Sequence, residues 1–308
     1  MRILHRKLLR EFLRMRGQAI AIGLVIACGV ASFVTMRSMY LSLLTSQADY
    51  YAQNRFASVF TELKRAPDSV SSRLKQIPGI AELQTRMVVD VTLDVPGLNE
   101  PAVGRLISIP EYPTPMLNDL FIRKGRYILP GRADEVIASE AFAVANQLQP
   151  GNELSAVING RWKKLVIVGV ALSPEYIYEI RGGGSVFPDN KRFGVLWISR
   201  EVLGPAFNMD GAFNSISVTL LPSASEPEVI SRLDSELERY GGLGAYGRAD
   251  QVSHRFISDE ISQNRISGSI IPAIFLGVAA LLVHFVFSRL VSTQRSRTAA
   301  GPFFVRRA

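Results

Sequence analysis

Two long apolar stretches constrain the fold of this 308-residue chain more than any other feature. Residues 17–36 and 266–288 contain no Asp, Glu, Lys or Arg, and Arg265 and Arg289 bound the second stretch. About 20 apolar residues in a helix cross the ~30 Å hydrocarbon core of a bilayer. No stretch between the two has this length and character. The sequence therefore predicts two transmembrane helices, one near each end.

The charges predict how these helices are oriented. Lys and Arg outnumber Asp and Glu by 35 to 27, but residues 1–16 and 289–308 each carry a net +5, so residues 17–288 carry a net −2. Basic residues beside membrane spans mark the cytoplasmic side. We therefore expect both termini in the cytoplasm, residues 45–262 outside it, and no nucleic-acid partner. The expected topology determinants are Arg2, Arg6, Lys7, Arg10, Arg14, Arg16, Arg289, Arg295 and Arg297.

Small residues recur every fourth position in both apolar stretches. Such a stripe occupies one helix face and lets another helix approach closely, so it predicts helix–helix packing in the membrane. The stripes are Ala19, Gly23, Ala27 and Ala31 in the first stretch, and Ser269, Ala273 and Gly277 in the second.

The chain divides into five predicted segments. An amphipathic helix with one basic face (1–16) lies on the cytoplasmic leaflet. A first transmembrane helix with its extension (17–44), an extracytoplasmic domain (45–262), a second transmembrane helix (263–288) and a basic cytoplasmic tail (289–308) follow. A cleaved signal peptide is the alternative for the first helix. The length of its apolar run and the absence of a small-x-small site directly after it favour an uncleaved anchor.

The domain between the spans is predicted to be α+β with two lobes. A strand at 56–63, a helix with Val70, Leu74 and Ile77 on one face, and a strand from Ile80 form one unit. A similar strand–helix–strand unit begins at Asn214, which predicts a lobe built from two βαβ-like halves. Residues 111–212 are expected to form an inserted, β-rich lobe. Within it, Asn159-Gly160 between two apolar runs predicts a hairpin.

No catalytic constellation stands out, so no enzyme activity and no bound cofactor are expected. Cys28 is the single cysteine, and His5, His254 and His284 are far apart, which disfavours a metal site. His254 is interpreted as a solvated surface residue, and Trp162 and Tyr176 as packing residues. His284, near a span end, is interpreted as reaching headgroups, with a proton relay as the alternative. The glycines of 181–185 lack P-loop spacing and are expected to form a surface loop.

Several motifs in this order resemble the FtsX-like/MacB-like permease family of ABC transporters. They are residues 9–18 leading into the first span, Pro78-Gly79-Ile80, residues 125–126 through 134–143, residues 167–171, and Arg289 to Arg295 after the second span. The resemblance covers nearly the whole chain and corresponds to the N-terminal half of such a permease.

The resemblance implies a porter-like α+β lobe with a β-rich inserted lobe, in a multi-pass protein of the bacterial inner membrane. It implies a second permease copy, a periplasmic adaptor, membrane lipids, and a separate cytoplasmic ABC ATPase that binds the ATP. The implied cargo is lipophilic or peptidic. The family continues with a coupling helix and at least two more spans, whereas this chain ends 13 residues after Arg295. A truncated or frameshifted permease is therefore expected.

Two other classes of protein share two spans around an outer domain. A sensor needs a cytoplasmic output domain, for which the residues after Arg289 leave no room. A regulatory protein whose outer domain binds an envelope partner without transport is the alternative that the sequence keeps open.

Overall fold

The computed structural model describes residues 16–181 and 187–299. The chain forms two units, Met1–Ser46 with Asp259–Ala308, and Gln47–Ser258. The predicted amphipathic helix, apart from Arg16, lies outside the described residues, as do the loop at 182–186 and residues 300–308. Each unit is described by itself.

The first unit contains most of two long helices, α2 (Arg16–Gln53) and α7 (Val252–Ala299). Both are long and apolar enough to cross a membrane, and nearly all of their apolar stretches are exposed. Exposed apolar side chains of this number need a non-aqueous environment or a partner. Helix α7 remains helical through Pro272.

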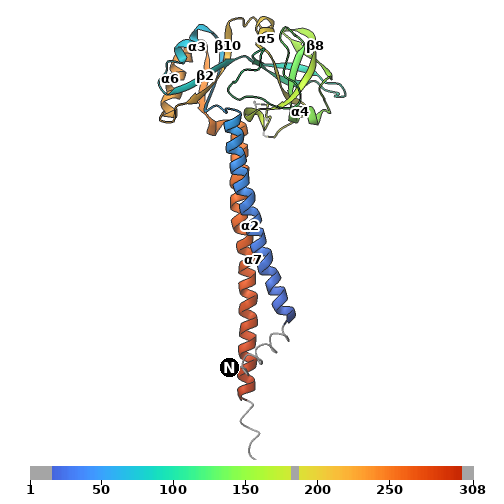
Figure 1. The fold of residues 1–308 in the computed structure, drawn as a ribbon, viewed down its shortest axis with the longest axis vertical. Helices are drawn as coiled ribbons and strands as arrows, with labels where there is room; N and C mark the ends of the chain where they lie inside the picture. The colour runs from blue at the N-terminus through green and yellow to red at the C-terminus, as the bar shows by residue number, and fades with distance from the viewer. Residues whose placement is uncertain (1–15, 182–186, 300–308) are drawn as a thin grey trace, which may run out of the picture. The chain divides into compact units, whose positions relative to one another are not determined.

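The two helices lie side by side along part of their length (Figure 1). Gly29 is buried, and a Cβ placed on it would lie 3.2 Å from Cβ of Phe275. A Cβ on Gly268 would lie 3.0 Å from Cβ of Met36. Glycine at these two positions therefore allows the close approach of the helices.

The first lobe of the second unit is a four-stranded antiparallel sheet of strand order β11-β1-β10-β2. Its elements are β1 (Val59–Pro67), α3 (Ser69–Leu74), β2 (Ile80–Arg86), β10 (Ala212–Leu220), α6 (Glu226–Leu237) and β11 (Gly242–Gly247). Strands β1 and β2 flank β10, and β10 and β11 flank β1, so each strand–helix–strand unit is a split βαβ. The predicted pair of βαβ-like halves is confirmed.

Both helices of this lobe cover the same face of the sheet. Val70 and Leu74 of α3 and Val229, Leu233 and Leu237 of α6 are buried against Val59, Leu63 and Leu83. Gly79, with φ of +97°, lies in the connection between α3, which ends at Leu74, and β2. The opposite face of the sheet carries Phe60 and Tyr246, whose stacked rings are 5.7 Å apart.

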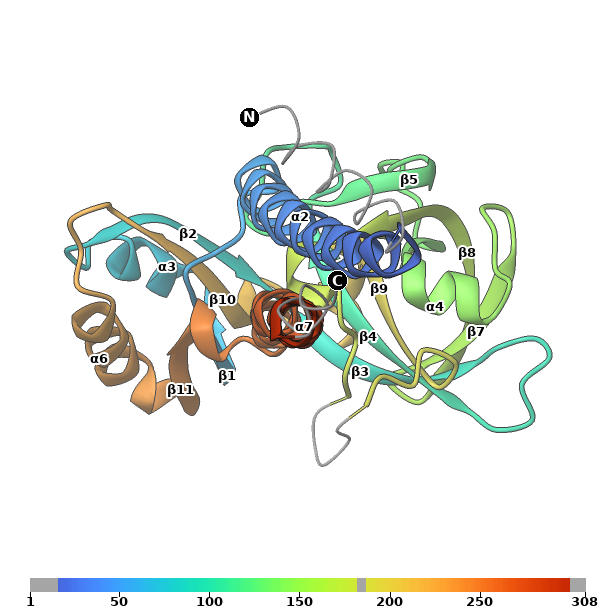
Figure 2. The ribbon, with the colours of Figure 1, turned by 90° about the horizontal axis from the view of Figure 1, so that it is seen from below.

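The second lobe is a seven-stranded mixed sheet of order β5-β8-β6-β9-β4-β3-β7, which closes on itself because β7 also pairs with β8. Figure 2 shows this lobe beside the first. Its strands are β3 (Val88–Asp94), β4 (Ala102–Ile109), β5 (Phe121–Gly125), β6 (Glu135–Ser139), β7 (Glu153–Ile158), β8 (Arg161–Leu172) and β9 (Phe193–Ser199). The helices α4 (Glu140–Ala145) and α5 (Arg200–Ala206) and the short 3-10 turn η1 (Pro174–Tyr176) complete it.

Close packing inside this lobe depends on glycine. A Cβ on Gly194 of β9 would lie 2.3 Å from the ring of Phe142 in α4, which is fully buried. Phe142 therefore fills the space that a side chain at this position would need. The predicted hairpin is confirmed, since Asn159 and Gly160 have φ of +48° and +75° between β7 and β8.

The predicted start of the inserted lobe at residue 111 is wrong. Strands β3 and β4, which precede it, already belong to the second sheet, so the insertion runs from Val88 to about Gly211. The sequence from Ile80 to Val95 is uniformly strand-like, but the chain passes from one sheet to the other at Met87. Periodicity within a strand does not show which sheet the strand joins.

The predicted fold class is confirmed as a mixed α+β protein. Two apolar helices lie at the ends of the described chain and flank a β-rich, two-lobed domain.

Candidate functional site

The two lobes are joined through a buried ion pair. Arg86, at the end of β2 in the first lobe, donates to both carboxylate oxygens of Glu175 in η1 of the second lobe, at 2.6 and 2.7 Å. Both side chains are 8% exposed. Burial acts to lower the pKa of Arg86, but the facing carboxylate outweighs burial and raises it above its ordinary value. The guanidinium is therefore charged and geometrically fixed.

Asn118 extends this pair into a network across the lobes. Its Nδ2 donates to Glu175 at 2.7 Å and to the Ser217 hydroxyl of β10 at 3.1 Å, while its Oδ1 accepts from the N–H of Ala57. Asn118 is 3% exposed and has φ of +56°, a conformation that asparagine tolerates better than most residues. The Asn118 side chain thus links β10 and Ala57, just before β1, in the first lobe with η1 in the second lobe.

The base of α7 is attached to the same network. Gln251 donates from Nε2 to the carbonyl oxygen of Glu175 at 2.7 Å. The hydroxyl of Ser253, which is fully buried, accepts from the N–H groups of Ile177 and Tyr178 at 3.1 and 3.0 Å. The first turn of α7 is therefore held by the segment that carries Glu175.

The end of α2 meets the start of α7 at this place. The hydroxyl of Tyr51 lies 3.1 Å from Nδ1 of His254, and Phe56 packs its ring 4.6 Å from that of Tyr51. Arg248 donates to the carbonyls of Phe56 and Ala57 at 2.6 and 2.8 Å. We call the residues around Arg86–Glu175, Asn118, Gln251, Ser253 and Tyr51–His254 the junction network.

The interpretation of His254 as a solvated surface residue is wrong. Its side chain is half-buried against Tyr51 and Phe56, and burial together with nearby Arg248 lowers its pKa, which favours the neutral ring. Trp162, interpreted as a packing residue, is 66% exposed at the tip of the β7–β8 hairpin. Tyr176 packs against the second lobe as expected.

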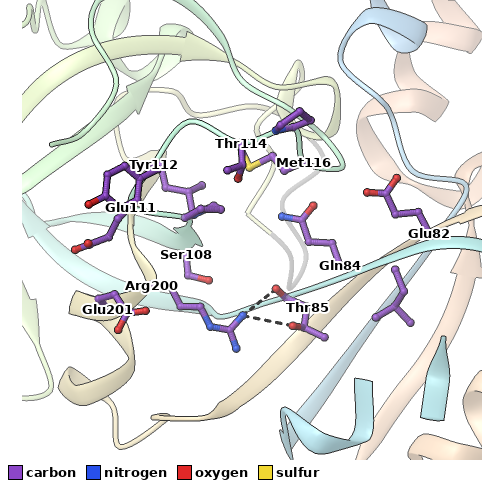
Figure 3. A pocket seen from close by; sticks show the side chains of 14 residues that line it. Glu82, Gln84, Thr85, Ser108, Glu111, Tyr112, Thr114, Met116, Arg200 and Glu201 are labelled. Atoms are coloured by element: carbon purple, nitrogen blue, oxygen red, sulfur yellow. Dashed lines mark hydrogen bonds between the residues drawn. The ribbon is translucent and has the colours of Figure 1, made fainter. Parts of the chain in front are cut away.

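Beside the junction network a cleft opens between the two lobes (Figure 3). Its volume is about 600 Å³. One wall is β2 from Glu82 to Thr85, and the opposite wall is the segment from Pro110 to Met116. Arg200 and Glu201, at the start of α5, and Ser108 complete the lining. The volume falls within the range of ligand-binding pockets.

Polar side chains hold the two walls of the cleft in place. Gln84 accepts from the N–H of Leu117 through Oε1, and Arg200 donates to the Thr85 carbonyl at 3.1 Å and to Asp68 at 2.7 Å. Three glutamates line the cleft, namely Glu82, Glu111 and Glu201. Of these, Glu82 pairs with Arg55. Because Arg200 is the one basic residue in this lining, the cleft is acidic.

Glu179 is a buried carboxyl in the second lobe. It is 1% exposed and accepts from the Ser139 hydroxyl at 2.9 Å. Burial raises its pKa to about 8, although this hydrogen bond acts in the opposite direction. Burial therefore favours the protonated form of the Glu179 carboxyl.

The predicted small-residue stripes are exposed on α2 and α7 wherever their side chains are described. Gly23, Ala27, Ala31, Ser269, Ala273 and Gly277 are exposed, and no atom lies within 4 Å of a Cβ built on Gly23 or Gly277. The side chain of Ala19 is not among those that the structure describes. Over residues 20–40 of α2, Gly29 is buried, and the partly buried positions are Ile22, Val25, Ser32, Met36 and Tyr40. Packing of the stripes against another chain stays a prediction.

The topology determinants are placed only in part. Arg16 and Arg289 lie in the described portions of α2 and α7, whereas Arg2, Arg6, Lys7, Arg10 and Arg14 precede the described residues. Arg295 and Arg297 fall in α7, and their side chains are not described. Over residues 16–181 and 187–299, no group of three or more His, Cys, Asp or Glu side chains is placed to hold a metal ion.

Sequence analysis missed the junction network. Arg86 interrupts the strand-like run from Ile80 to Val95, and an arginine at an inward position of a strand is the signal that points to a buried partner. Its partner Glu175 lies 89 residues further on, which no local pattern reveals.

No family model matches the chain, and no curated protein is detectably similar to it in sequence. Solved structures show a likeness in fold. The periplasmic region of MacB from Actinobacillus actinomycetemcomitans has 12% identity and a TM-score of 0.39, covering 70% of this chain and 98% of that one.

Two further solved structures are similar to the same extent. The extracellular domain of the noncanonic ABC-type transporter YknZ from Gram-positive bacteria has 13% identity and a TM-score of 0.38, covering 62% and 98% of the two chains. A domain of a protein described as a permease from Porphyromonas gingivalis has 13% identity and a TM-score of 0.35, covering 63% and 90%. Likeness at this level assigns no function, so the proposal below rests on the chain's own residues.

Proposed function

We propose that this chain is a membrane subunit of an FtsX/MacB-type ABC transporter, corresponding to the N-terminal half of the permease. In this proposal α2 and α7 cross the membrane, the two-lobed domain is extracytoplasmic, and ATP is hydrolysed by a separate cytoplasmic subunit. The order of motifs along the sequence supports the family, and the two long apolar helices support the membrane location.

The observation that carries the proposal is the attachment of both helix ends to one buried network between the lobes. The end of α2 supplies Tyr51 and the start of α7 supplies Ser253 and His254, all within the unit that contains the lobes. Buried, hydrogen-bonded ion pairs tolerate little distortion because separating them exposes an uncompensated charge. A displacement of either helix end is therefore passed to both lobes.

The expected transport cycle follows from this attachment. ATP-driven closure of two permease copies on the cytoplasmic side shifts the helices, and the junction network converts the shift into movement of the lobes. Export or extraction of a lipophilic or peptidic cargo is the proposed outcome. A periplasmic adaptor and membrane lipids are the other proposed partners.

Co-purification tests the proposal. The tagged full chain, solubilised gently from its native cells, is expected to bring down an ABC ATPase together with a second permease chain. The variant Arg86→Met with Glu175→Leu, which lacks the charges of the junction network, is expected to retain these partners but to lose transport-dependent release of cargo. Recovery of neither an ATPase nor a permease chain would contradict the proposal.

The regulatory alternative differs in one measurable respect. A non-transporting regulator binds an envelope partner through the outer domain and needs no ATPase for that binding. The same purification in the presence and absence of ATP distinguishes the two, because only a transporter subunit is expected to change its partner content with nucleotide.

A further inference from the structure

The outer edge of β2 is an unpaired strand edge that faces the cleft between the lobes. Strand β2 pairs with β10 on one side, and among the described residues no strand pairs with it on the other. Open strand edges are templates for another strand. Residues Glu82 to Thr85 of this edge form one wall of the cleft.

The register shows which backbone groups face the cleft. In β10 the carbonyl of Val218 accepts from the N–H of Ser58 and so points toward β1. Backbone direction alternates along a strand, so Ser217 and Thr219 point toward β2. Their partners are Gln84 and Glu82.

The intervening residues of β2 consequently point away from β10. These are Leu83 and Thr85, and the contact of Arg200 with the Thr85 carbonyl from outside the sheet agrees with this direction. The N–H and C=O of Leu83 and the N–H of Thr85 are thus directed toward the cleft. These three backbone groups can form hydrogen bonds with one short stretch of an added strand.

The side chains around this edge select for basic residues. Glu82, Glu111 and Glu201 line the cleft. Glu82 already pairs with Arg55, and the single lining arginine, Arg200, is held by Asp68 and Thr85, so the preference for basic residues rests mainly on Glu111 and Glu201. In Figure 3 Glu82 and Gln84 lie toward one side of the cleft and Glu111 and Tyr112 toward the other, so an inserted chain passes between carboxylates from both walls.

We propose that the cleft binds an extended, basic peptide segment of a partner protein, which adds as a strand to the outer edge of β2. Backbone hydrogen bonds to Leu83 and Thr85 supply the register, and the glutamates supply the preference for Lys or Arg side chains. Three backbone groups support only weak binding of a free peptide. A segment tethered to a docked partner gains from its effective concentration, which is why the occupant is a partner protein and not a free peptide. The proposal requires neither membrane crossing nor an ATPase.

Fluorescence anisotropy of the full chain in detergent micelles tests it with three synthetic peptides. The first alternates valine with lysine, the second alternates valine with glutamate, and the third has the sequence of the first with alternate amides N-methylated. Binding of the first peptide is expected, and the other two should bind at least about tenfold more weakly. The second loses charge complementarity to the glutamates, and the third loses backbone hydrogen bonds to β2. Equal binding of the N-methylated peptide would overturn strand addition, and no binding of the first at millimolar concentration would overturn the site.

Variants of the chain give a second test. Thr85→Pro removes an outward N–H on an edge strand, where proline is tolerated, and is expected to weaken the first peptide about tenfold. Glu111→Gln with Glu201→Gln should weaken it and reduce its salt dependence. The control Glu238→Gln removes an exposed carboxylate outside the cleft and should change nothing.

Hydrogen exchange keeps the test independent of whether Thr85→Pro folds. The first peptide is expected to slow amide exchange in β2 of the unmodified chain, and slowing elsewhere with none in β2 would overturn the proposal.

Discussion

At the scale of single residues, Glu179 makes the stability of the outer domain depend on pH. Its pKa is about 8 in the folded chain, against an ordinary value of 4.5. Between these values the unfolded chain releases this proton while the folded chain keeps it, so stability falls as pH rises from about 4.5 to 8. Below that window both states are protonated and the residue contributes no pH dependence.

The variant Glu179→Gln is expected to remove this penalty while keeping an acceptor for Ser139. It should gain stability over the unmodified chain, and the gain should be larger at pH 8 than at pH 5 by about 3–4 kcal/mol. Fluorescence of Trp197, which is 3% exposed in the same lobe, follows unfolding. Glu153→Gln, at an exposed carboxylate, is the control, and an equal gain at both pH values for Glu179→Gln would contradict the prediction.

Arg86 and Glu175 behave as one unit because neither is exposed enough to be hydrated alone. Arg86→Met or Glu175→Leu alone leaves a buried charge without its partner and is expected to cost about 3–5 kcal/mol. The double variant should cost much less than the sum of the two single variants. Denaturant unfolding measures all three. The exposed pair Lys164–Glu153, N to O 3.5 Å, is the control and should show a coupling below about 1 kcal/mol. Additive losses for the buried pair would contradict this account.

At the scale of elements, local patterns predicted the helices and strands but not their partners. The strand–helix–strand unit that begins at Asn214 and the Asn159-Gly160 turn depend on near neighbours in sequence, and each is confirmed. The change of sheet at Met87 depends on Ser108, which exchanges two hydrogen bonds with it across 21 residues, and no periodicity reports such a contact.

The helix pair shows the same limit. Small residues at every fourth position mark a helix face that permits close approach, but they do not say which helix approaches it. Gly29 and Gly268 stand outside the predicted stripes and make the close contacts, because the facing residues Phe275 and Met36 are large enough to need the space.

Cysteine cross-linking tests this pairing. In a Cys28→Ser background, Met36→Cys with Gly268→Cys is expected to form an intrachain disulfide under mild oxidation, since the two Cβ positions are near each other. Proteolysis between the helices should then leave the two fragments linked. Gly23→Cys with Gly277→Cys, built on the predicted stripes, should not cross-link within a chain. The reverse pattern would contradict the described pairing.

At the scale of the whole molecule, we interpret the net charge of +8 as a sign of the proposed topology, because of where the charges lie along the chain. The positive surplus lies in residues 1–16 and 289–308, which each carry a net +5, while residues 17–288 carry a net −2. The acidic cleft between the lobes belongs to this negative part of the chain. Charge distribution could therefore be predicted from the sequence alone, whereas the cleft requires the fold that brings β2 beside Glu111 and Glu201.

In the proposed topology, α2 and α7 cross a membrane with the two-lobed domain outside and both ends in the cytoplasm. Labelling of single cysteines in intact cells with a membrane-impermeant maleimide tests it most directly, because Cys28 is the only cysteine to replace. In the Cys28→Ser background, Asn99→Cys in the exposed β3–β4 turn should be labelled without disruption of the inner membrane, and Ser292→Cys only after permeabilisation. Labelling of Ser292→Cys in intact cells, or protection of Asn99→Cys, would contradict the account.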